Sequence, residues 1–116
     1  MIRGIGTDIQ EISRIQSSMK RERFLARCFL PREIEYCMSK PRPAEHIAAR
    51  FCAKEAFAKA CGRPQKWHEV MITNNENGAP GICLSGSAAE ALKGCRIHVS
   101  VSHSGNYAAA TVIIEE

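Results

Sequence analysis

The feature that most constrains the fold is a long helical segment in the middle of the chain, roughly residues 44–61. Small side chains recur in it at the spacing of one helical face, so the segment can pack closely against a sheet: Ala49, Ala53, Ala56 and Ala60. The opposite half is charged and still contains Phe51, which is not typical of a solvated face. Gly62 follows at the position of a left-handed helix cap.

The charged half of this helix suggests a chemistry. Arg50 and Lys54 are four residues apart, and so are Glu55 and Lys59, so each pair shares a helical face. The first pair is repulsive, and an anion bound between the two cations would remove that cost. A carboxylate such as Glu55 can hold a hard cation. Cations beside a carboxylate therefore suit a metal-bound phosphate ester.

The remaining elements follow from hydrophobic spacing and turn residues. The pattern predicts a first strand over residues 2–9, with a helix beginning near Asp8 or Ile9. The other predicted elements are a short helix over 32–38, strands over 69–73 and 81–85, a short helix over 88–93 capped by Ser87, and strands over 97–103 and 107–114. Helices in the first half and antiparallel strands in the second predict an α+β fold, with helices packed on a small antiparallel sheet. A length of 116 residues predicts a single domain, residues 1–116.

The amino-acid composition limits the kinds of molecule that this protein is expected to bind. The formal net charge of +4 fits an anionic partner, but seven aromatic residues offer few stacking platforms, so nucleic acid is not expected. No apolar run has membrane-spanning length and the first residues lack a signal-peptide pattern, so no membrane partner and a cytoplasmic location are expected. Six cysteines without a C-x-x-C spacing are typical of small buried residues in a reducing compartment.

Several other residues are open to two interpretations. Asp8 is either a helix N-cap or, with Glu55, part of a magnesium site. His103, at a hairpin turn, is either a surface histidine or a donor to a phosphate. The turn at residues 77–80 can be only a turn. The basic residues Arg14, Arg21 and Arg23 form either a solvated face or a docking surface.

Three blocks of sequence together carry a resemblance. Residues 4–12 read GIGTDIQEI, residues 49–60 read ARFCAKEAFAKA, and residues 99–108 read VSVSHSGNYA. Their order and spacing resemble the holo-acyl-carrier-protein synthase family, the short phosphopantetheinyl transferases. Residues 75–80, NENGAP, match a fourth and weaker block. The resemblance covers nearly the whole chain.

The resemblance implies an activity and roles for individual residues. Members of this family transfer 4'-phosphopantetheine from coenzyme A to a serine of apo acyl carrier protein, for fatty acid biosynthesis, and release adenosine 3',5'-bisphosphate. It implies Mg²⁺ as cofactor with ligands Asp8 and Glu55, and catalytic roles for Glu55 and Lys59. It places around coenzyme A the residues Arg50, Lys59, Asn77, Gly78, Pro80, His103 and Ser104. Arg14, Arg21 and Arg23 correspond to the surface that docks the acidic carrier. Short family members are typically homotrimers with each active site between two subunits.

Two points stay open at this level. Either Glu55 or a metal-bound water can take the proton of the carrier serine. The loop at residues 61–67 is shorter than the Gly-Thr-Gly loop of the family and has no second glycine. The alternatives to a transferase are a non-catalytic module that binds coenzyme A or a nucleotide, and a domain that binds acidic helices. Neither explains Asp8, Glu55, Lys59 and His103 together.

Overall fold

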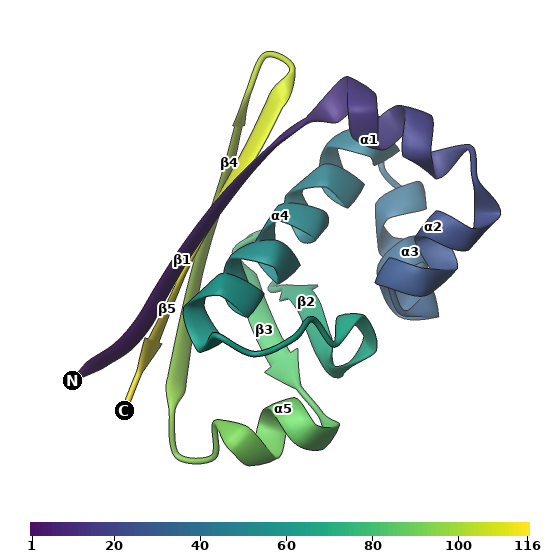
Figure 1. The fold of residues 1–116 in the computed structure, drawn as a ribbon. Helices are drawn as coiled ribbons and strands as arrows, with labels where there is room; N and C mark the ends of the chain where they lie inside the picture. The colour runs from purple at the N-terminus through teal and green to yellow at the C-terminus, as the bar shows by residue number, and fades with distance from the viewer.

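The structure is a computed structural model that describes residues 1–116 and consists of one long helix packed on an antiparallel sheet (Figure 1). The sheet has the order β1-β5-β4, formed by β1 (Ile2–Glu11), β4 (Arg96–Ser104) and β5 (Tyr107–Glu115). The helix α4 (Pro43–Cys61) covers one face of this sheet, and a separate hairpin pairs β2 (Val70–Asn74) with β3 (Pro80–Leu84). The predicted α+β class is confirmed. No helix is long and apolar enough to cross a membrane.

The alanine face of α4 lies directly against β1, as its spacing predicts. Gly4 and Gly6 of β1 face this helix, and a Cβ atom on them would overlap the carbonyl oxygens of Ala60 and Ala56 respectively. Only glycine therefore permits this approach of strand to helix. The alternate residue Ile5 points to the other face of the sheet, where it is 66% exposed.

The boundary between the first strand and the first helix differs from the prediction. β1 continues to Glu11, and α1 (Ile12–Met19) begins only at Ile12. The reason is the ladder with β5, which pairs Asp8 with Ala110 and continues to Glu11 and Tyr107. Asp8 therefore lies inside a strand, and its interpretation as a helix N-cap is wrong.

The smaller helices are partly predicted. The predicted helices at 32–38 and 44–61 correspond to α3 (Pro31–Met38) and α4, and Gly62 adopts the expected left-handed conformation with φ 68°. The helix α2 (Glu22–Cys28) and the 3₁₀ turn η1 (Trp67–Glu69) are additional. The helix α5 (Gly86–Ala91) starts before residue 88 and has Ser85 as its N-cap, while the Ser87 hydroxyl donates to Glu69 Oε1 at 2.7 Å.

The charged half of α4 contains a buried ion pair. The side chain of Lys54 is completely buried, and its Nζ lies 2.6 Å from Oε1 of Glu33 on α3. The same Nζ donates to the carbonyl oxygens of Cys28 at 2.8 Å and Trp67 at 2.9 Å. All three N–H groups of the Lys54 ammonium therefore have an acceptor. The prediction that an anion binds between Arg50 and Lys54 is wrong for Lys54, since Glu33 already neutralises the charge of this lysine.

Glu33 extends this connection to further elements. Its Oε1 also accepts the backbone N–H of Leu30, at the start of α3, at 2.9 Å. Its Oε2 accepts the backbone N–H of Ile72, on β2, at 2.9 Å. The ion pair of Lys54 and Glu33 thus connects α4 to α2, α3, η1 and β2 through direct hydrogen bonds.

Three cysteines belong to the core. Cys28, Cys37 and Cys52 have no exposed surface, and no cysteine forms a disulfide. Burial raises the pKa of the Cys37 thiol to about 11. These three behave as small apolar residues, as predicted, whereas Cys83 is exposed.

Candidate functional site

The first group of predicted residues meets where β1 crosses α4. Asp8 lies on the helix-facing side of β1, and its side chain is only 9% exposed. The Nζ of Lys59 lies 3.3 Å from Asp8 Oδ1 and donates to the carbonyl oxygen of Thr7 at 3.0 Å. The Lys59 side chain is 56% exposed, so its ammonium can turn from Asp8 to an arriving anion.

Glu55 lies one helical turn before Lys59 and is half-buried. Its Oε1 accepts a hydrogen bond from Gln65 Nε2 at 3.1 Å. Burial first, then Asp8 and to a lesser degree Glu55, raise the pKa of the Cys52 thiol to about 12. Both carboxylates therefore lie near the same buried thiol, on the β1 side of α4.

These two carboxylates fit a hard cation. They form an all-oxygen donor set of the kind that Mg²⁺ prefers. No cluster of three or more His, Cys, Asp or Glu side chains is placed to hold a metal ion. Such a cation would take its remaining ligands from phosphate oxygens and water, as is usual when magnesium binds together with a phosphate substrate.

The second group surrounds Arg50, which is buried to 4% exposure. Its Nη2 donates to Asn74 Oδ1 at 2.7 Å, and its guanidinium lies 4.4 Å from the centre of the Tyr36 ring. Its Nε atom is buried and has no hydrogen-bond partner. A buried donor without an acceptor costs free energy, so this arginine is poised to receive an anion.

A cavity of about 270 Å³ adjoins Arg50 and is also lined by Gly78, Pro80 and His103. His103 Nε2 lies 3.6 Å from Oε1 of Glu45, which lines the same cavity. The structure thus brings together four of the residues that the family resemblance places around coenzyme A.

The same cavity contains a histidine to which the sequence assigns no role. Burial, and secondly Lys40 and Arg50, lower the pKa of His46, which is therefore neutral at pH 7. Its ring packs edge-on against Tyr36, with 6.2 Å between the ring centres. The cavity therefore has a neutral aromatic wall beside its cations, which suits a ligand with a flat ring and a phosphate.

Three of the residues predicted around coenzyme A stay outside the cavity: Lys59, Asn77 and Ser104. Asn77 and Ser104 are exposed and do not line it. The backbone N–H of Asn77 donates to the side chain of Asn75 at 2.9 Å, so this residue shapes the turn. Asn74 and Tyr36, which hold Arg50, were missed: Asn74 stood out only as a turn residue, and nothing marked Tyr36.

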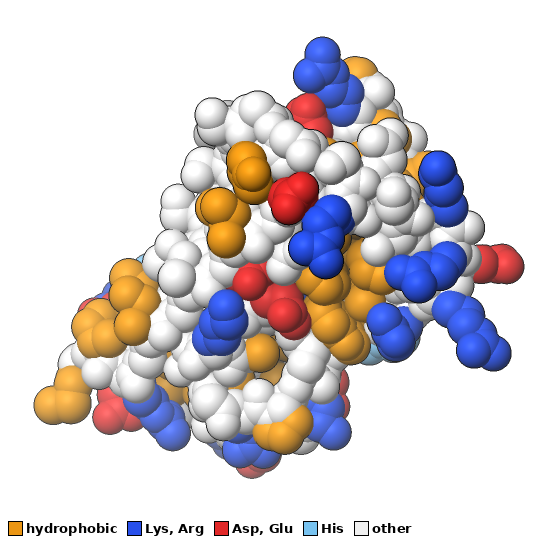
Figure 2. Space-filling view, turned by 45° about the horizontal axis from the view of Figure 1, so that its top comes forward, with side chains coloured by type: hydrophobic (Ala, Val, Ile, Leu, Met, Phe, Trp, Pro, Cys, Tyr) orange, Lys and Arg blue, Asp and Glu red, His pale blue; other side chains and the backbone are white.

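The three predicted docking residues lie on one side of the molecule. Arg14 is on α1, Arg21 precedes α2 and Arg23 is within α2, and all three are exposed. Figure 2 shows Lys and Arg side chains gathered on the side that these helices form. No acidic side chain forms an ion pair with any of the three, so their charge is free for a partner.

The two groups of site residues are separate within the chain. Arg50 and Lys59 are nine positions apart on α4, about 13 Å along its axis. No residue of the Asp8, Glu55 and Lys59 group lines the cavity beside Arg50.

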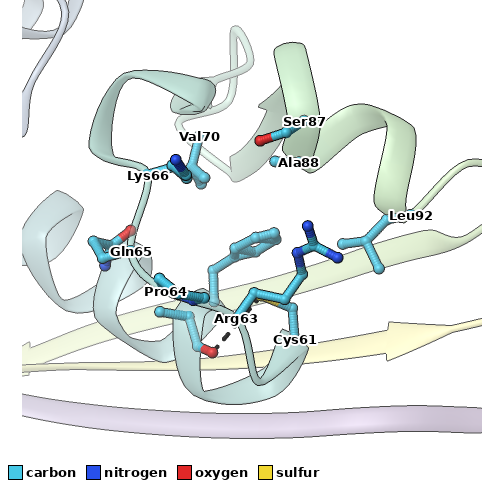
Figure 3. A pocket seen from close by; sticks show the side chains of 11 residues that line it. Cys61, Arg63, Pro64, Gln65, Lys66, Val70, Ser87, Ala88 and Leu92 are labelled. Carbon is cyan, nitrogen blue, oxygen red and sulfur yellow. Dashed lines mark hydrogen bonds between the residues drawn. The ribbon is translucent and has the colours of Figure 1, made fainter.

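A different and smaller pocket lies between the end of α4, the loop that follows it and α5 (Figure 3). Its lining includes the apolar side chains of Phe57, Val70 and Leu92 and the cationic residues Arg63 and Lys66. None of the predicted site residues lines it.

Comparison with known proteins shows which family the chain is similar to. Residues 4–112 match the 4'-phosphopantetheinyl transferase superfamily. The chain is 43% identical over 125 residues to a holo-[acyl-carrier-protein] synthase of Koribacter versatilis, covering all of both chains. It resembles the crystal structure of holo-[acyl-carrier-protein] synthase from Neisseria meningitidis with a TM-score of 0.91 and 32% identity, covering all of both chains. A synthase from Bacillus anthracis in complex with CoA (3',5'-ADP) gives a TM-score of 0.85 and 31% identity, covering 100% of this chain and 98% of the other.

Proposed function

The chain belongs to the 4'-phosphopantetheinyl transferase superfamily, within the holo-acyl-carrier-protein synthase family, and from this premise we propose how its own residues carry out the reaction. The protein transfers 4'-phosphopantetheine from coenzyme A to a serine of apo acyl carrier protein and releases adenosine 3',5'-bisphosphate. A non-catalytic binding module or an acidic-helix interaction domain is not favoured, because relatives named as synthases match the whole chain. We further propose that the reaction serves fatty acid biosynthesis in the cytoplasm.

The observation that carries the site assignment is the contact of Lys59 with Asp8 where β1 packs against α4, with Glu55 one helical turn before Lys59. We propose that Asp8 and Glu55 hold Mg²⁺, which when bound neutralises charge on the diphosphate of coenzyme A. Lys59 turns from Asp8 to the reacting phosphate and stabilises the charge that develops there. Glu55 or a water molecule accepts the proton of the carrier serine. Phosphoryl transfer needs chiefly such positioning and charge neutralisation.

The cavity beside Arg50 is proposed to bind the nucleotide end of coenzyme A. The guanidinium of Arg50, which lines this cavity, supplies a donor for a phosphate, and His103 supplies a second. Gly78 and Pro80 form the wall contributed by the β2–β3 hairpin. Asn77 and Ser104 do not line the cavity and are exposed, so they are proposed to contact only the part of the ligand that extends out of the cavity.

The separation of the two groups supports a homotrimer in which each active site lies between two subunits. In this proposal one subunit supplies Asp8, Glu55 and Lys59, and its neighbour supplies Arg50 and His103. The uncovered face of the sheet carries three exposed isoleucines of β1: Ile2, Ile5 and Ile9. Figure 2 shows hydrophobic side chains on the side of the molecule where this strand runs. Burial of that face would stabilise an assembly of a chain this small.

The test of the function is intact-mass spectrometry of apo acyl carrier protein incubated with this protein, coenzyme A and magnesium. A gain of one phosphopantetheine mass that EDTA abolishes is the expected result. Absence of any gain with several apo carriers would contradict the transferase. An undiminished gain in EDTA would contradict the metal site alone.

Reversing one charge on the docking surface is expected to weaken recognition of the carrier. Arg14→Glu should raise the Michaelis constant for apo carrier about tenfold, with little change in the constant for coenzyme A, because like charges then face each other across the interface. The loss should shrink at high salt, where exposed charges are screened. Steady-state kinetics at two ionic strengths measures both effects, and Lys93→Glu, at an exposed position after α5, is the control for a charge reversal elsewhere on the surface. Equal constants for the two variants would argue against this surface.

A further inference from the structure

Two glutamine side chains hold the two carboxylates of the proposed metal site. Gln10 Nε2 donates to Asp8 Oδ2 at 3.0 Å, and Gln65 Nε2 donates to Glu55 Oε1 at 3.1 Å. Each carboxylate is thus held by a neutral amide at one oxygen. Asp8 Oδ1 remains for the mobile Lys59, and Glu55 Oε2 has no partner.

Gln10 reaches Asp8 because of the strand that carries both. Residues two apart in a strand point to the same face, so the two side chains stand next to each other on the helix side of β1. Both are partly buried there. The contact is therefore built into the register of β1 rather than made by a free surface side chain.

Gln65 reaches Glu55 from the shortened loop after α4. Its Nε2 also donates to the carbonyl oxygen of Lys54 at 3.1 Å, so the two amide hydrogens each have an acceptor on α4. Figure 3 shows Gln65 on this loop, at the edge of the pocket between α4 and α5. The loop is thus tied to α4 at the position where the carboxylate of Glu55 must be fixed.

From these contacts we infer that Gln10 and Gln65 are positioning residues, which orient Asp8 and Glu55 so that one oxygen of each is presented to a divalent cation. This inference rests on the proposed metal site. An amide donor suits the task because it fixes a carboxylate without bringing a positive charge that would repel the cation. Partners that orient metal-binding carboxylates typically contribute about 10–100-fold to metal affinity.

The chain supplies its own control, because its third glutamine, Gln16, is exposed on α1 and contacts neither carboxylate. The experiment compares Gln65→Met, Gln10→Met and Gln16→Met, each of which removes one amide at nearly constant size. Mn²⁺ is the probe, and its dissociation constant in the presence of coenzyme A is measured from the electron paramagnetic resonance signal of the free ion. Thermal unfolding of each variant shows whether the fold is retained.

Gln65→Met and Gln10→Met are each expected to weaken Mn²⁺ binding about tenfold, and Gln16→Met to leave it unchanged. The metal concentration for half-maximal transfer should rise in parallel, while the rate at saturating metal stays close to that of the original protein. Mn²⁺ affinities within twofold of the control would overturn the inference, and so would an original protein that binds no Mn²⁺. Failure of the original protein to transfer phosphopantetheine would overturn the proposed function instead, since the comparison of Mn²⁺ affinities does not depend on turnover.

Discussion

Lys54→Met is expected to lower the free energy of unfolding by about 3–5 kcal/mol, the usual effect of removing one partner of a buried ion pair. The variant would leave the Glu33 carboxylate, which is 2% exposed, without its counter-ion. It would also leave the carbonyl oxygens of Cys28 and Trp67 without their donor. A domain of this size has only about 5–15 kcal/mol of stability, so a large share of the free energy of unfolding would be lost.

Urea unfolding followed by circular dichroism measures this loss. Lys93→Met, which removes an exposed lysine, is the matched control and should change the midpoint little. The double variant Lys54→Met with Glu33→Gln should recover part of the stability, because no buried charge then lacks a partner and the amide oxygen still accepts a backbone N–H. A midpoint for Lys54→Met equal to that of the control would show that the ion pair contributes nothing.

The second large effect is expected on activity. Glu55→Ala should reduce magnesium-dependent transfer about a thousandfold, since a bound metal contributes several kcal/mol to catalysis and each ~1.4 kcal/mol is a factor of ten in rate. The fold should be retained, because Glu55 is only half-buried and its substitution removes a single side-chain hydrogen bond, the one from Gln65. The rate of mass gain of apo carrier, measured over a range of magnesium concentrations, gives the effect directly.

Two further variants make this result specific. Glu55→Gln keeps the size of the side chain but not its charge, and should be almost as inactive as Glu55→Ala. Glu90→Ala removes an exposed carboxylate on α5 and should retain full activity. Normal turnover in Glu55→Ala would refute the assignment of Glu55 to the metal site.

The long helix could be predicted because its signals are local. Alanines at helical spacing and Gly62 at the cap depend only on neighbouring residues. The partner of Lys54 could not be predicted in this way, because Glu33 is 21 residues away and the two meet only when α3 packs on α4. The sequence around Lys54 therefore does not indicate that this lysine forms a buried ion pair inside the protein.

At the end of β1 a local pattern predicted the wrong boundary between strand and helix. Ile9, Ile12 and Ile15 have helical spacing, and the sequence accordingly predicts a helix from residue 8 or 9. The hydrogen bonds that keep the strand extended to Glu11 come from β5, about a hundred residues later. Tertiary pairing outweighed local preference at the end of the strand that carries Asp8, so this strand continues two residues beyond its predicted end at residue 9.

The buried cysteines of the core can be used to follow local unfolding of the helices that carry them. Cys28, Cys37 and Cys52 lie on α2, α3 and α4 in turn and are sealed from solvent, whereas Cys83 on β3 is open to it. A thiol reagent would therefore modify Cys83 at once and the three core thiols only after their helices separate. The mass added over time would show whether these helices detach one by one or as a single cooperative unit.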